Sequence, residues 1–180
     1  MGGILTFSSS IYSQCTDLFF SEYIEGSGNS KALEIYNPTS SAIDLAGYEV
    51  HKNTNGNGTL SILTFSAGTN LAAGGTYLIV NTSADAGLLA LADVTNSTVV
   101  NFNGNDPVQL VKVSSGSTID KIGEVMAGPP STWPVGSGAT AEYTLVRMGS
   151  INQGQTDWAV GATEWDVYPQ NDFTHAGAHN

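Results

Sequence analysis

The sequence predicts an all-β domain, a β-sandwich, on three observations. The 180-residue chain contains 19 Ser, 18 Thr, 14 Asn and 21 Gly, residues that favour strands and turns over exposed helices. Short apolar runs alternate with turn residues along most of its length, at the spacing typical of a sandwich. Hydrophobic residues make up 41% of the chain, which is enough for a buried core in one domain of this length.

About nine short strands are expected, because short runs that are either apolar or alternate between apolar and polar residues recur with turn residues between them. They cover residues 18–24, 32–36, 43–51, 59–65, 76–81, 98–102, 107–113, 118–125 and 142–148. Residues 26–30 are expected to close a hairpin, and the two Asn-Gly pairs within residues 53–58 predict another.

One short helix is expected over residues 83–93, capped by Ser83, with Leu88, Leu89 and Leu91 on its apolar face. The C-terminal third is predicted to form an irregular extension. It carries three tryptophans, which are expected to pack against the domain rather than lie in a disordered tail: Trp133, Trp158 and Trp165.

Residues 1–16 are interpreted as a truncated signal-peptide remnant or a flexible lead, and residues 17–180 as one domain. Cys15 is the only cysteine, so the chain can form no internal disulfide and no four-cysteine zinc site. No apolar stretch approaches the ~20 residues of a membrane span.

The charge balance argues against nucleic acid as a partner of this chain alone. Sixteen acidic and five basic residues give a formal net charge of -11. Affinity for nucleic acid comes largely from Lys and Arg that neutralise phosphates. The only arginine is Arg147, and the four lysines are scattered.

No catalytic motif is present: the sequence has no G-x-S-x-G elbow, no H-E-x-x-H and no P-loop. His51 lies at the end of a strand run near a predicted hairpin, and His175 and His179 are expected to be solvent-exposed residues of the tail. We therefore expect that the chain is not an enzyme and that it needs no cofactor.

Three carboxylates form a candidate calcium site. Glu22 and Glu34 lie on neighbouring strands if residues 26–30 close a hairpin, and Glu25 opens that loop. Calcium takes six to eight oxygen ligands from carboxylates and carbonyls. The alternative is structural: Glu34 accepts hydrogen bonds from Lys31 or a tyrosine, and Glu22 caps the amides of a nearby loop.

Several segments together resemble the lamin tail domain family, and specifically its secreted bacterial version. They are residues 20–27, 31–39, 43–48, 71–79, 102–110 and 119–123, and then Arg147, 156–158 and 164–169, the last three being similar to an extension of the bacterial members. The resemblance runs from about Leu18 to the C-terminus.

This resemblance implies an immunoglobulin-like β-sandwich that acts as a non-catalytic binding or adhesion module, secreted or at the cell surface. The implied partner is an unknown protein or a surface glycan, and the implied state is a monomer or weak dimer. One alternative is an accessory module of a secreted hydrolase or nuclease that binds carbohydrate or nucleic acid, with calcium dependence. Another is a structural module that associates through sheet edges.

Overall fold

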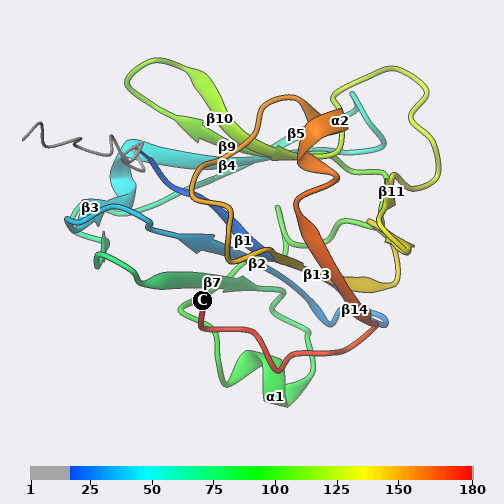
Figure 1. The fold of residues 1–180 in the computed structure, drawn as a ribbon, viewed down its shortest axis with the longest axis horizontal. Helices are drawn as coiled ribbons and strands as arrows, with labels where there is room; N and C mark the ends of the chain where they lie inside the picture. The colour runs from blue at the N-terminus through cyan, green and yellow to red at the C-terminus, as the bar shows by residue number, and fades with distance from the viewer. Residues whose placement is uncertain (1–16, 180) are drawn as a thin grey trace, which may run out of the picture.

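Two β-sheets stack face to face in the computed structural model, which describes residues 17–179 (Figure 1). The six-stranded sheet has the order β14 (Trp165–Pro169), β13 (Tyr143–Arg147), β1 (Phe19–Glu25), β2 (Lys31–Tyr36), β7 (Thr76–Val80) and β8 (Val94–Thr95). The four-stranded sheet has the order β10 (Ser117–Ile122), β9 (Val108–Lys112), β4 (Tyr48–Asn53) and β5 (Leu60–Thr64). Only β7 and β8 pair in parallel among the described strands.

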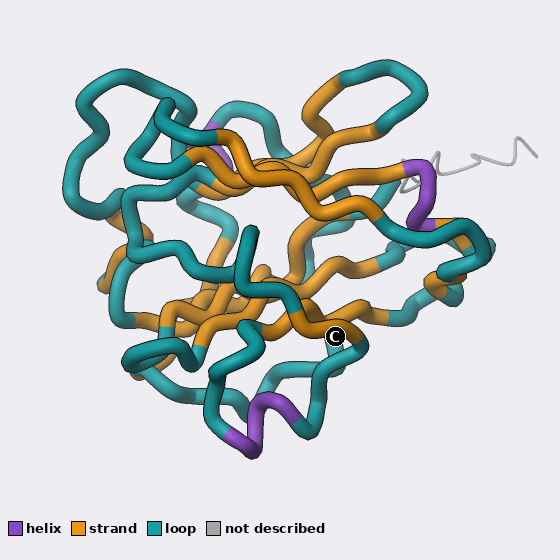
Figure 2. Tube along the Cα trace, turned by 180° about the vertical axis from the view of Figure 1, so that it is seen from behind, coloured by secondary structure: helices purple, strands orange, loops and turns teal. Residues whose placement is uncertain are grey.

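The remaining elements are small and lie at the margins of the sandwich. Two two-stranded ribbons pair β3 (Ile43–Asp44) with β6 (Asn70–Leu71), and β11 (Pro134–Val135) with β12 (Gly138–Ala139). Helical structure is limited to η1 (Leu45–Gly47), α1 (Ala86–Leu89) and α2 (Trp158–Gly161) in the described residues (Figure 2). None of the helices in residues 17–179 is long and apolar enough to cross a membrane.

The main core lies between the two sheets. Tyr23, Leu33 and Leu145 from the six-stranded sheet pack with Val50 and Leu110 from the four-stranded sheet. The three tryptophans belong to this cluster, which confirms that the C-terminal third packs against the domain. A second apolar cluster covers the outer face of the six-stranded sheet, where α1 and the C-terminal segment pack on β1, β2 and β7.

The all-β sandwich and both predicted hairpins are confirmed. β1 and β2 flank the 26–30 turn, in which Gly28 has a φ of 58°, and β4 and β5 flank the two Asn-Gly pairs. Nine described strands have five or more residues. Eight of them overlap expected strands, and the ninth does not.

The strand expected over 98–102 is wrong. The side-chain oxygen of Asn96 accepts hydrogen bonds from the backbone amides of Thr98 and Val99. The side-chain amide of Asn81 donates to the Val100 carbonyl. Side chains therefore satisfy the backbone that a neighbouring strand would otherwise pair. The ninth long strand is β14, in the region expected to be irregular, where Trp165 and Val167 face the core and Asp166 faces out.

The helix prediction is correct in place and wrong in detail. α1 covers four residues, and its cap is Asp85 rather than Ser83, because the Asp85 carboxylate accepts from the Gly87 amide. Leu88 is buried, whereas Leu91 is exposed. The second short helix, α2, capped by Asp157, was not expected.

Candidate functional site

Glu22 and Glu34 face each other across the β1–β2 pair, on the outer face of the six-stranded sheet. A bulge between Phe20 and Glu22 sets this orientation. Because of the extra residue, Phe20 and Tyr23 both face the main core, and Glu22 points out with Ile24. The structure thus brings together two of the three carboxylates predicted to bind calcium.

The C-terminal segment covers this pair. After β14 it turns back alongside α1 toward β7 (Figure 1), and Phe173 and Ala176 pack on the outer apolar cluster. The amide of Gly177 donates to Glu34 Oε2 at 2.6 Å, and the hydroxyl of Ser21, the bulged residue, donates to Oε1 at 2.6 Å. Glu34 is therefore buried with both carboxyl oxygens hydrogen-bonded.

Glu22 is also buried, at 1% exposure, and neither of its carboxyl oxygens has a hydrogen-bond partner. Burial, followed by the negative charges of Glu34 and Asp172, raises the pKa of Glu22 to about 9. Burial raises the pKa of Glu34 to about 7, opposed by the hydrogen bonds from Ser21, Gly177 and Thr76. At neutral pH Glu22 is therefore protonated and uncharged. If it lost this proton, its carboxylate would repel the neighbouring carboxylate of Glu34.

Glu25 lies on the opposite face of β1, with Tyr23, away from Glu22 and Glu34. Its carboxylate pairs with the Lys31 ammonium and accepts from the Glu142 amide. Within residues 17–179 no three His, Cys, Asp or Glu side chains are arranged to hold a metal ion. Calcium binding stays a prediction, and the residues that remain together for it are Glu22 and Glu34.

Calcium at this pair predicts that a chelator destabilises the protein. At a calcium concentration a hundred times the Kd, binding contributes about 2.7 kcal/mol, equivalent to a melting temperature higher by about 5–11 °C. Adding EDTA should remove that increment from the wild-type chain and from Glu25→Gln, but not from Glu22→Gln, as measured by scanning calorimetry. An unchanged wild-type melting curve would exclude the calcium hypothesis.

The histidines of the tail are not solvent-exposed as expected. The His179 ring packs edge-on against Tyr36 and Phe19, with centroids at 4.7 and 5.6 Å. Burial, with the nearby Arg147 charge, lowers the pKa of His179. His175 contacts the Tyr168 ring at 4.2 Å, and His51 pairs with Glu49 at 2.8 Å. Each histidine serves packing or a local hydrogen bond.

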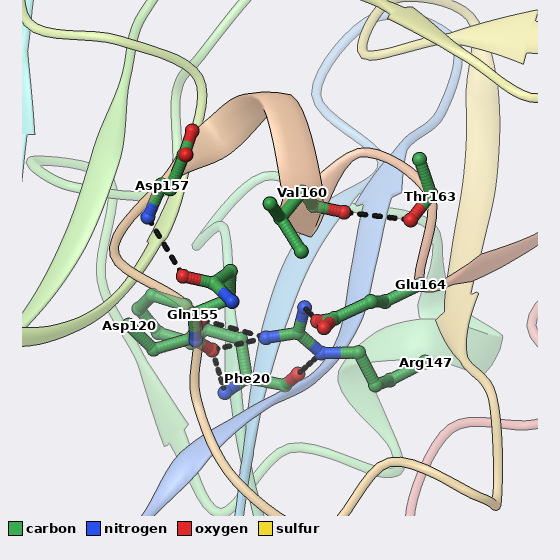
Figure 3. Close-up of polar contacts among 8 residues, drawn as sticks. All are labelled: Phe20, Asp120, Arg147, Gln155, Asp157, Val160, Thr163 and Glu164. Carbon is green, nitrogen blue, oxygen red and sulfur yellow. Dashed lines mark hydrogen bonds and ion pairs between the residues drawn. The ribbon is translucent and has the colours of Figure 1, made fainter.

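A buried ionic network around Arg147 was not anticipated (Figure 3). Its guanidinium contacts Asp120 at 2.6 and 2.7 Å, Glu164 at 2.8 Å and the Phe20 carbonyl at 3.2 Å. Asp120 also accepts from the amides of Phe20 and Gln155. Arg147 and Asp120 are both buried, and the guanidinium stacks over Trp165 at 4.4 Å.

This network connects the two sheets, because Asp120 lies on β10 and Arg147 on β13. The three charged groups are paired with one another, and Asp120 and Arg147 are fully buried, so the network is structural rather than a site for substrate chemistry. The sequence held one signal for it, the single arginine of the chain within an otherwise apolar strand.

Most of the exposed large apolar side chains lie on three segments, which are β5, the loop after β10 and α2. Seven large apolar side chains are exposed among residues 17–179, and five of them form what we call the apolar end: Leu60, Ile62, Val125, Met126 and Val160. The turn between β4 and β5 packs on the loop after β10, since a Cβ on Gly56 would lie 2.3 Å from the Met126 carbonyl oxygen. α2 lies beside that loop, where the Trp158 amide donates to Glu124.

The Lamin Tail Domain family model matches residues 12–126, more than half of the chain. The chain belongs to the lamin tail domain family. This family is a non-enzymatic, immunoglobulin-like domain family whose members are binding or structural modules. A comparison with curated proteins gave no match.

The family match ends at residue 126, before α2, β13 with Arg147, and β14 of this lamin tail domain. These strands nevertheless complete the six-stranded sheet, since β13 pairs with β1 and β14 with β13. The C-terminal third is therefore part of the same folded unit.

Proposed function

We propose that this lamin tail domain is a non-catalytic module of the secreted bacterial type, outside the cell or at its surface, which binds a partner protein through the apolar end. The observation that carries the proposal is the concentration of five of the seven exposed apolar side chains at that end. Clusters of exposed apolar side chains on a soluble domain are typical of protein interaction sites.

The arrangement of the charged groups supports a module without catalysis. Asp120, Arg147 and Glu164 neutralise one another, and Glu25 is paired with Lys31. Glu22 and Glu34, which have raised pKa values of the kind found in active sites, lie buried beneath the C-terminal segment and out of reach of a substrate.

Binding and catalysis are tested side by side. We expect no turnover in a hydrolase and nuclease screen with added divalent metals. We also expect ligands from a displayed peptide library to lose at least tenfold in affinity when Val125 and Met126 are both changed to Asp. Val113→Asp, an exposed position outside the apolar end, is the control that should bind normally. Turnover abolished by Glu22→Gln, or peptides indifferent to the apolar end, would contradict the proposal.

A second candidate is a calcium-dependent accessory module that binds carbohydrate beside a hydrolase. The unpartnered carboxyl of Glu22 next to Glu34 favours it, because a cation could replace the missing hydrogen-bond partners. A glycan array probed with and without calcium tests this role. Calcium-dependent glycan binding that Glu22→Gln removes would favour it over protein binding.

A further inference from the structure

The outer strand β5 is an open sheet edge at the apolar end. It pairs only with β4 on one side, in a regular antiparallel register. No backbone hydrogen bond outside that pairing involves residues 60–64 in the described chain. In an antiparallel edge strand, every second residue presents its N–H and C=O to the open side. β5 can therefore accept another strand.

The other edges of the two main sheets are protected in the ways that natural proteins use. β10 has a bulge between Thr118 and Asp120 and carries charged residues. β14 carries the exposed Asp166 and ends at Pro169. β8 is only two residues long. β5 has neither charge, nor proline, nor bulge.

The side chains of β5 favour an apolar partner strand. Leu60 and Ile62 point away from the core and are 47% and 44% exposed, whereas Leu63, on the other face of the strand, packs against the core. A strand added beside β5 would place alternate side chains next to Leu60 and Ile62, as cross-strand neighbours.

Charge selects the partner. All charged residues of the chain lie within residues 17–179, so the net charge of -11 belongs to the described domain. On the outer face of the sheet, Glu49 lies opposite Thr64 at the end of β5. A second copy of the domain would carry the same net charge of -11 and would be repelled. A basic segment would be attracted by the negative electrostatic potential of the domain.

We infer that β5 captures an extended segment of a partner protein as an added strand, and that this segment has alternating apolar residues and a net positive charge. The inference rests on the proposed function, since it names the element of the apolar end that binds and the chemistry of its ligand. Main-chain hydrogen bonds would supply affinity, and contacts with the side chains of Leu60 and Ile62 would supply selectivity.

A library of displayed ten-residue peptides, selected against the whole chain, tests the inference. Enriched peptides should be basic with alternating apolar residues, and they should slow amide exchange within residues 60–64. Leu60→Lys and Ile62→Lys should each weaken them at least tenfold by calorimetry. Val113→Lys adds the same charge at an exposed position outside the apolar end, and should change binding less than twofold. Unchanged melting temperatures verify that the variants fold.

Several results would overturn the inference. Enrichment of acidic peptides, no enrichment at all, equal binding by Ile62→Lys, or a dimer whose contact protects residues 60–64 would each do so. In another outcome, peptides bind Ile62→Lys normally but lose affinity for the Val125→Asp and Met126→Asp double variant. That result would contradict strand addition at β5 and would still support the proposed function. Peptides indifferent to both sets of substitutions would remove both.

Discussion

Replacing Arg147 with alanine should lower the free energy of unfolding by about 3–5 kcal/mol, which for a domain of this size corresponds to a melting temperature lower by about 6–20 °C. The loss comes mainly from Asp120, which would remain a buried carboxylate without its guanidinium partner. The stacking of the guanidinium over Trp165 and Phe19 would be lost as well. Urea denaturation followed by tryptophan fluorescence measures the change.

Two variants make this measurement specific. Lys112→Ala removes an ion pair with Asp17 in which the lysine is 39% exposed, so it should cost no more than about 1 kcal/mol. Arg147→Lys should not restore stability, because an ammonium cannot replace the planar guanidinium that contacts two carboxylates and a carbonyl at once. A loss below 1 kcal/mol for Arg147→Ala would show that the network does not hold the sheets together.

Glu22→Gln should make the domain less sensitive to alkaline pH. In the wild type the pKa of Glu22 is raised from 4.5 to about 9 by burial and by the charges of Glu34 and Asp172. The folded chain therefore holds a proton that the unfolded chain releases between these values. Stability from this group is complete below pH 4.5 and is lost as the pH rises toward 9.

Each pKa unit corresponds to about 1.4 kcal/mol, so the four pH units between pH 5 and pH 9 correspond to a loss on the order of 5 kcal/mol from Glu22. Glu34, whose pKa is about 7, adds to the same slope in the lower half of this window. Glutamine keeps the size of the side chain and removes the ionisation, so Glu22→Gln should be more stable than wild type at pH 9. Denaturant titrations at several pH values give the slope directly.

Glu124→Gln is the matched control, because the Glu124 side chain is 40% exposed and pairs with Lys121 at the surface. Its pH profile should follow the wild type. Wild-type stability that stays constant from pH 5 to pH 9 would show that water reaches Glu22 or that the C-terminal segment does not seal the pair.

The sequence predicted much of the fold because strands and turns are encoded locally. Short apolar runs bounded by turn residues place β4, β7 and β9, and the Asn-Gly pairs place the turn between β4 and β5. The same local reasoning failed over 98–102, where apolar residues are buried but Asn96 and Asn81 satisfy the backbone. It also missed β14, which becomes a strand only because β13 is available beside it.

The candidate calcium ligands illustrate the same division. That Glu22 and Glu34 are neighbours followed from the hairpin turn at residues 26–30. That Glu25 lies on the other face follows from strand alternation alone, because Glu22 and Glu25 are three positions apart on β1 with no bulge between them. The C-terminal segment then decided that the pair is buried, through the bond from Gly177 to a residue 143 positions earlier.

Taken alone, the sequence determined the class of fold, the hairpins and the acidic, motif-free character of the domain. These properties follow from overall composition and from patterns that span only a few neighbouring residues. Tertiary structure decided which carboxylates are buried, where Arg147 finds its partners and which sheet edge stays open. Those outcomes depend on segments far apart in the chain, such as Asp120 and Phe20, whose pairing no local pattern specifies.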